Sequence, residues 1–295
     1  MLFTLGSLPS AALIAVGLQA GAWAHSWIGR ATPTEHFYDL SGAATHLALV
    51  AHALAGARKG GGGISPRAAA LAALSTVWAA RLGYYLFSRV SRLGSDERFT
   101  ELKKRPATWA VPWTFQALWC FLLQAPLTVV ARAAARGGAL TPLDAVAAAL
   151  ALGGLALEAA ADSHKDAAKR AAPGKPVMTG PFSLCVYPQY FGECTLWLGA
   201  AALAAPACAG AGQLALVAAA PAFTALLLHR VSGIPLLERS SWKNYGSSEE
   251  YRDYRARTSL FFPWPQDAVA RPERLAEVRA LAEAAAARAA ARKLA

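Results

Sequence analysis

A polar stretch between two apolar segments decides how this chain folds: residues 158–193 read EAAADSHKDAAKRAAPGKPVMTGPFSLCVYPQYFGE. The flanking segments, 142–161 and 190–206, are apolar enough to lie in a lipid bilayer. Glu158 and Asp162 are four residues apart, which places both carboxylates on one face of a helix. Carboxylates at membrane depth are costly and face a protein interior or a water-filled cavity. We therefore expect chemistry in or beside a membrane.

The composition of the whole chain fits this setting. Hydrophobic residues make up 55% of the 295 residues and charged residues only 16%, whereas a soluble domain carries about a quarter. The net charge of +11 comes partly from basic residues between the hydrophobic stretches, where they set topology or contact anionic headgroups. No nucleic-acid recognition motif accompanies this charge, and the four cysteines show no metal-ligand spacing. We therefore expect neither a nucleic-acid partner nor a bound metal.

Span lengths give the expected architecture, because a hydrocarbon core of about 30 Å takes about 20 apolar residues. Candidate spans lie at 8–28, 38–57, 68–88, 109–131, 142–161, 190–206 and 212–230. The prediction is an all-α, polytopic transmembrane bundle of about seven spans in residues 1–265, followed by an Ala/Arg-rich tail helix in 266–295. The tail has a thin apolar stripe, so we expect it to be mobile or to lie on lipid headgroups.

Basic residues gather in the odd-numbered loops and after the last span. The positive-inside rule then places the N-terminus outside and the C-terminal region in the cytosol. Every polar constellation described below falls on that cytosolic side, so a cytosolic cosubstrate is expected. The protein would be an integral, multi-pass membrane protein, in the endoplasmic reticulum of a eukaryote or otherwise in an inner membrane.

The loop after the third span carries a charged turn with Arg89, Arg92, Asp96 and Arg98 around Gly94. Arginines offer forked donors that suit phosphate, and a glycine lets the backbone approach a ligand. The same residues also fit a simple cytosolic anchor of the span.

Two further groups of polar residues lie at the start of the sixth span and after the seventh. Gln189, Tyr190 and Glu193 fall at three- and four-residue steps, which gives one polar face able to bind an amide or ribose hydroxyls, although Glu193 also fits a helix cap. After the last span, Tyr251 and Arg255 belong to an aromatic and basic segment. That segment fits an interface helix that covers a pocket, or an aromatic belt with no ligand.

Taken together, these motifs resemble the membrane steroid 5-alpha-reductase family, in particular its C-terminal-domain branch of uncharacterised membrane proteins. The resemblance covers residues 35–265. The matching motifs are Glu35-His36-Phe37-Tyr38-Asp39-Leu40-Ser41-Gly42, Arg92-x-Gly-x-Asp-x-x-Arg98, Glu158-x3-Asp162-x2-Lys165, Pro188-Gln189-Tyr190-Phe191-Gly192-Glu193, Gly233-Ile234-Pro235-x2-Glu238 and Tyr251-x2-Tyr254.

The resemblance implies a seven-span bundle whose cytosolic half holds NADPH. The cofactor reduces a carbon–carbon double bond conjugated to a carbonyl in a lipophilic substrate, which would be sterol-like, prenyl or a fatty enone. The residues implied to bind the cofactor are Arg92, Arg98, Glu158, Asp162, Lys165, Gln189, Tyr190, Glu193, Tyr251 and Arg255. Partners would be this substrate and membrane lipids, and the oligomeric state is left open.

The resemblance also implies catalytic groups for the carbonyl oxygen, where negative charge develops during reduction. Glu35 or Asp39 would be the acid, with Tyr84 or Tyr85 as a second hydrogen-bond donor. The structural alternative is that Asp39 caps the second span while the two tyrosines pack against neighbouring helices.

The chain departs from the branch at one point, where Val186-Tyr187 stands in place of Arg-His before the proline. Either neighbouring basic loops replace the lost donors, or the nucleotide site is altered. Two alternatives to the reductase therefore remain: a non-catalytic membrane lipid-binding descendant, and a methyltransferase of the isoprenylcysteine type that uses S-adenosylmethionine.

Overall fold

The computed structural model describes residues 7–60, 63–133, 139–264 and 272–294. Within these residues the chain is helical and forms no β-strand, which confirms the expected all-α class. The chain divides into two compact units. The first comprises Met1–Leu152 and Leu196–Thr224, and the second comprises Gly153–Thr195 and Ala225–Ala295.

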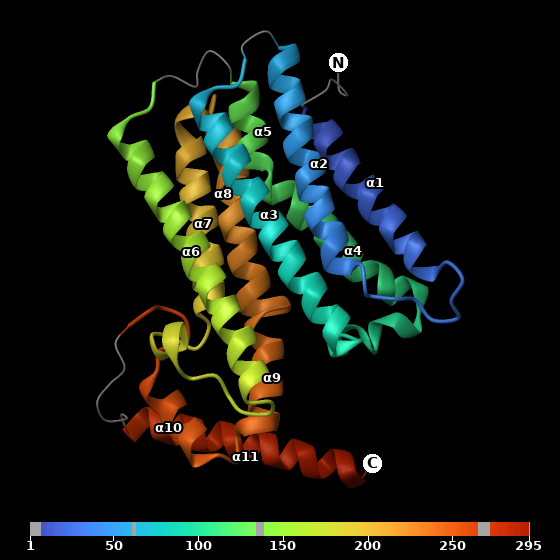
Figure 1. Cartoon of the computed structure of the whole chain (residues 1–295), viewed down its shortest axis with the longest axis vertical. Helices are drawn as coiled ribbons and strands as arrows, with labels where there is room; N and C mark the ends of the chain where they lie inside the picture. The colour runs from blue at the N-terminus through green and yellow to red at the C-terminus, as the bar shows by residue number, and fades with distance from the viewer. Residues whose placement is uncertain (1–6, 61–62, 134–138, 265–271, 295) are drawn as a thin grey trace. The chain divides into compact units, whose positions relative to one another are not determined.

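The first unit is built around α2, which packs against α1, α3, α4 and α5 (Figure 1). Its helices are α1 (Leu8–Trp27), α2 (Tyr38–Lys59), α3 (Pro66–Leu93), α4 (Pro106–Leu123) and α5 (Ala125–Arg132), with parts of α6 (Pro142–Ala171), α7 (Pro188–Ala204) and α8 (Ala211–Leu226). Short 3-10 turns are η1 (Glu97–Phe99), η2 (Leu102–Lys104) and η4 (Ala205–Ala207).

Small residues let the helices of the first unit approach closely. Gly83 of α3 faces Ala43 of α2, and a Cβ on Gly83 would overlap the Ala43 methyl group. Gly199 of α7 lies against α6, where an added Cβ would stand 2.6 Å from the carbonyl oxygen of Ala147. Helices in a membrane associate through this kind of close van der Waals contact, because lipid tails are as apolar as leucine.

Capping residues in the sequence set several helix ends. Ser7 and Ser65 each accept a hydrogen bond of 3.2 Å from the backbone N–H three residues on, at the starts of α1 and α3. Gly94 ends α3 with a φ of 78°, a left-handed conformation that glycine adopts without steric cost. This ending turns the chain into the charged loop that carries Asp96.

The second unit gathers around an aromatic core. It contains the remaining parts of α6, α7 and α8, followed by η5 (a π-helical turn, Leu227–Val231), α9 (Ile234–Tyr245), α10 (Glu249–Arg257) and α11 (Pro272–Leu294), and η3 (Gly180–Ser183) precedes α7. Trp242, Tyr251 and Tyr254 form the centre of this core. Helix α11 packs against α9 and α10, as the red and orange ribbons of Figure 1 show.

The tail helix differs from the expectation of a mobile or headgroup-bound segment. Val278 is only 5% exposed and joins the aromatic core, with Leu275 packed beside it. The thin apolar stripe of the tail is therefore buried against aromatic side chains of this unit. The boundary expected between residues 265 and 266 falls in 265–271, outside the described residues.

In the part of the chain that the structure describes, four helical segments are long and apolar enough to cross a membrane: Tyr38–Lys59, Pro106–Arg132, Pro142–Ala171 and Ala211–Tyr245. These segments indicate a membrane protein. Each of the other three expected spans is helical, and α1 and α3 carry polar residues within the helix, such as Gln19 and Arg81. Helix α7 has only 17 residues and includes Glu193.

Candidate functional site

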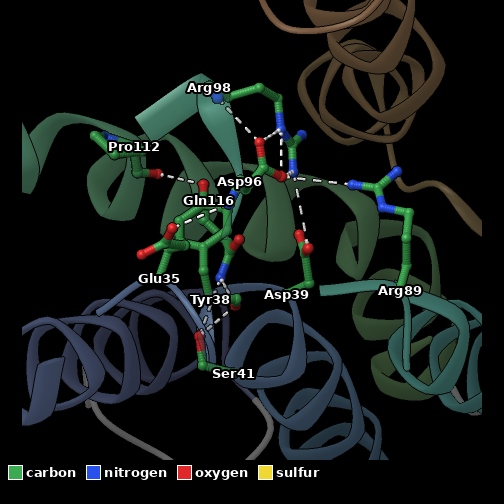
Figure 2. A network of polar contacts seen from close by, with 9 residues as sticks. All are labelled: Glu35, Tyr38, Asp39, Ser41, Arg89, Asp96, Arg98, Pro112 and Gln116. Carbon is green, nitrogen blue, oxygen red and sulfur yellow. Dashed lines mark hydrogen bonds and ion pairs between the residues drawn. The ribbon is translucent and has the colours of Figure 1, made fainter. Parts of the chain in front are cut away.

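A charged network surrounds the start of α2 in the first unit (Figure 2). Glu35 is 7% exposed, and its Oε1 accepts a hydrogen bond of 3.0 Å from the backbone N–H of Asp96. Its other oxygen, Oε2, accepts from Lys103 Nζ at 2.5 Å. Burial alone would raise the pKa of Glu35, but the hydrogen bonds from Lys103 and Asp96 outweigh it and lower the pKa. Glu35 is therefore ionised at neutral pH.

Asp96 is the second carboxylate of the network. Arg98 donates to both of its oxygens, with Nη2 at 2.6 Å from Oδ2, and Arg89 Nη2 lies 3.5 Å from the same oxygen. Burial would raise the pKa of Asp96, but the hydrogen bonds and charge of Arg98 lower it. Arg98 Nη2 also lies 3.8 Å from Asp39 Oδ2, so Arg98 bridges two carboxylates (Figure 2).

Gln116 of α4 fixes the backbone at the start of α2. Its Nε2, with two N–H groups, has three acceptors within reach: the carbonyl oxygen of Tyr38 at 2.9 Å, Gln19 Oε1 at 2.9 Å and Ser41 Oγ at 3.2 Å. The Tyr38 hydroxyl in turn donates to the Pro112 carbonyl at 2.9 Å (Figure 2). These bonds hold the first turn of α2 against α4 and use the donors of Gln116.

A small cavity of about 30 Å³ opens next to this network. Its lining residues are Asp39, Ala43, His46, Trp78, Ala79, Leu82, Gly83, Leu86, Gln116 and Trp119. Three helices, α2, α3 and α4, thus supply an apolar wall with three polar side chains, those of Asp39, His46 and Gln116.

The four residues predicted as catalytic differ in their relation to the cavity. Asp39 lines it, whereas Glu35 does not. The ionised state of Glu35 does not suit a proton donor. Tyr84 is 76% exposed and Tyr85 is half-buried, and neither lines the cavity. Asp39 does not cap α2 either, since Phe37 occupies the N-cap position without a side-chain bond.

The second unit buries the predicted acidic face. Glu158 is 2% exposed, Asp162 and Glu193 are 8% exposed, and Gln189 is 6% exposed. A Cβ on Gly192 would stand 2.7 Å from the backbone nitrogen of Glu158, so α7 approaches α6 as closely as only glycine allows. Glu193 lies in the second turn of α7 rather than at its end, which excludes a cap.

Within this face Glu158 of α6 and Glu193 of α7 both lie close enough to Cys194 to interact electrostatically with its thiol. The amide oxygen of Gln189 is buried and has no hydrogen-bond partner among the described residues. Lys165 and Tyr190 are half-buried, and the Tyr190 ring stacks on that of Tyr187 with centroids 5.8 Å apart.

An ion pair between the buried Arg255 and the partly buried Glu238 joins α10 to α9 in the same unit. Arg255 Nη1 and Nη2 donate to the two oxygens of Glu238 at 2.9 and 3.0 Å. Trp242 Nε1 donates to Glu238 Oε2 at 3.0 Å, and the Arg255 guanidinium lies 5.1 Å from the Trp242 ring centroid. Arg255 Nη1 also donates to the Tyr251 hydroxyl at 3.2 Å. These contacts favour a structural role for Arg255 and Tyr251 over the predicted cofactor contact.

The Val186-Tyr187 pair contributes to the cluster of hydrogen bonds around Glu238. Val186 N and Tyr187 N donate to the carbonyl oxygens of Ser259 and Leu260 at 2.9 and 3.2 Å. Burial and the nearby charge of Glu238 raise the pKa of Tyr187, so its hydroxyl stays protonated and donates to Glu238 Oε1. Tyr187 thus adds a neutral donor to Glu238 at the position where the resemblance implied a histidine.

Of the two remaining predicted cofactor residues, Arg92 is exposed at the end of α3 and Arg98 belongs to the Asp96 network. Sequence reasoning missed His46 and Gln116, although a polar residue inside an apolar span was a usable signal. It also assigned no role to Glu238, which accepts hydrogen bonds from Arg255, Trp242 and Tyr187 in the structure.

The four long apolar helices indicate a helical membrane protein. The chain belongs to the family described as "Protein of unknown function (DUF1295)", which matches residues 25–258. No curated protein and no solved structure matches the chain.

Proposed function

We propose that this protein is an integral membrane oxidoreductase that uses NADPH to reduce a carbon–carbon double bond conjugated to a carbonyl in a lipophilic substrate. In this proposal seven helices cross the membrane, with the N-terminus outside and the C-terminal region in the cytosol. The resemblance of residues 35–265 to steroid 5-alpha-reductases supports the reaction type.

The observation that carries the proposal is the buried amide oxygen of Gln189, which lacks a hydrogen-bond donor among the residues described. Leaving a buried acceptor unpaired costs about 1–3 kcal/mol, so such an atom calls for an explanation. A nicotinamide carboxamide or a ribose hydroxyl supplies the missing donor. The residues around Gln189 therefore fit the polar part of a nicotinamide nucleotide, which when bound supplies a hydride.

The chain's own groups divide the remaining tasks. Arg255 is already neutralised by Glu238, so we assign it to holding α9 against α10 rather than to binding phosphate. In the first unit, Asp39 at the cavity wall is the acid that fits better than Glu35, which is ionised through Lys103. The hydrogen-bond donor for the substrate oxygen belongs in the cavity between α2, α3 and α4, whose wall is largely apolar.

A thermal-shift experiment on the purified protein in detergent tests the proposal. A ligand that binds only the folded state at about 100 times its Kd stabilises it by about 2.7 kcal/mol, so NADPH should raise the thermal midpoint. Gln189→Leu should abolish the shift. Asn244→Leu, which changes an exposed amide of the same unit, should retain it.

The outcomes separate the proposal from its rivals. A shift with S-adenosylmethionine but none with NADPH would identify a methyltransferase instead. A second candidate, a non-catalytic lipid-binding protein, is favoured by the closed Arg255–Glu238 pair and by Tyr187, which removes the usual cationic donors from this turn. No shift with either nucleotide would support that candidate and refute the reductase.

A further inference from the structure

The cavity of the first unit contains a buried polar atom that the first-unit network leaves unpaired. His46 is 1% exposed and lines the cavity. Its Nε2 has no hydrogen-bond partner among the described residues. A buried ring nitrogen without a partner at the wall of a cavity indicates that an unseen group supplies one.

The hydrogen bond of the other ring nitrogen, Nδ1, decides whether Nε2 donates or accepts. Gln124 Nε2 lies 3.1 Å from His46 Nδ1, and in this orientation the amide donates while Nδ1 accepts. The proton of the neutral imidazole is then on Nε2. His46 therefore presents an N–H donor and requires an acceptor.

The other two polar side chains of the cavity already have partners. The N–H groups of Gln116 are used by Tyr38, Gln19 and Ser41. Asp39 Oδ2 faces Arg98 Nη2 at 3.8 Å. Of these three cavity side chains, His46 is the one with a buried nitrogen that has no hydrogen-bond partner among the described residues.

Size and wall chemistry limit the occupant. About 30 Å³ accommodates roughly one or two water-sized groups, so the cavity suits one functional group and not a ring system. The His46 ring meets the indoles of Trp78 and Trp119 edge to face, with centroids 5.0 and 4.8 Å apart. An apolar body that continues beyond the cavity would contact these aromatic and aliphatic walls.

We propose that His46 Nε2 donates a hydrogen bond to the carbonyl oxygen of a lipophilic ligand whose polar end enters this cavity. The inference rests on the proposed function for the class of ligand, an apolar molecule with a ketone. His46 then selects ligands that end in an acceptor, and Trp78 and Trp119 hold the adjoining apolar part.

Infrared spectroscopy of 2-dodecanone with the full-length protein in a maltoside detergent tests this, because the detergent has no carbonyl. Subtracting the spectrum of the ¹³C-ketone from that of the ¹²C-ketone isolates the ketone band. A bound population should appear at lower frequency than the ketone in empty micelles. His46→Phe keeps a ring between the two indoles but removes the N–H, so the shifted band should vanish and affinity should fall roughly tenfold.

Two further variants keep the test decisive. His52→Phe replaces another buried histidine of α2, one that bonds Ser10 outside the cavity, and it should retain the shifted band. Ala79→Leu fills the cavity without altering His46, so it should lose the band even if His46→Phe folds poorly.

The inference is overturned if the wild type shows no shifted band, which would mean that water alone occupies the cavity, or if the band survives in His46→Phe. The assay contains no nucleotide. A shifted band in a protein that fails to respond to NADPH would therefore support the cavity assignment while refuting the reductase.

Discussion

Removing either partner of the Glu238–Arg255 pair tests how the second unit is held together. In Glu238→Gln the Arg255 side chain, 7% exposed, keeps its charge, because arginine does not deprotonate inside proteins. A buried charge that loses its counter-ion costs about 3–5 kcal/mol. In Arg255→Met the Glu238 side chain is 22% exposed and keeps the donors of Tyr187 and Trp242. We therefore expect a smaller loss of about 2 kcal/mol.

The double variant Glu238→Gln/Arg255→Met removes both charges, so it should be less destabilised than Glu238→Gln alone. The free energy of unfolding is measured by reversible SDS titration in mixed micelles, followed by tryptophan fluorescence. Asp253→Asn disrupts an exposed pair on the same helix α10 and should change stability by less than about 0.5 kcal/mol. The reasoning is refuted if Glu238→Gln costs no more than this control, or if the two single losses simply add in the double variant.

Two other expectations follow from close packing and from charge. Gly192→Ala should destabilise the protein by about 1–3 kcal/mol, because its methyl group would meet the α6 backbone at 2.7 Å. The control Gly153→Ala, which adds its methyl group in open space, should stabilise the protein by up to about 1 kcal/mol. Equal unfolding free energies for the two variants would contradict this expectation. The folded-state pKa of Glu35 lies below its ordinary value of 4.5, so its stabilisation is present above that value and lost as pH falls through the lowered pKa. Lys103→Met should therefore flatten the fall of the thermal midpoint below about pH 5, and an unchanged pH profile would argue against the ion pair.

Local pattern was enough to predict the helices. Every expected span is helical, because runs of alanine and leucine favour helix whatever they pack against. Whether α1, α3 and α7 also cross a membrane depends on polar residues such as Gln19, Arg81 and Glu193, whose cost depends on what they face. Hydropathy averages a segment and does not contain that information.

The candidate site was predictable only within single helices. Spacing placed Glu158 with Asp162, and Gln189 with Glu193, and all four are buried. Contacts between residues far apart in the sequence could not be predicted from spacing. His46 meets Gln124, a residue 78 positions away, because α2 packs against α5, and periodicity does not say which faces of two helices meet.

The close glycine contacts between helices explain why a membrane chain would be so rich in alanine. At Gly83 and Gly199 the opposing residues, Ala43 and Ala147, bear a single methyl group. Leucine at such places would partition more strongly into lipid but would push the helix axes apart. The modest hydropathy of these helices thus accompanies the close approach of their backbones. A substitution at these contacts that improves membrane insertion should loosen the folded bundle.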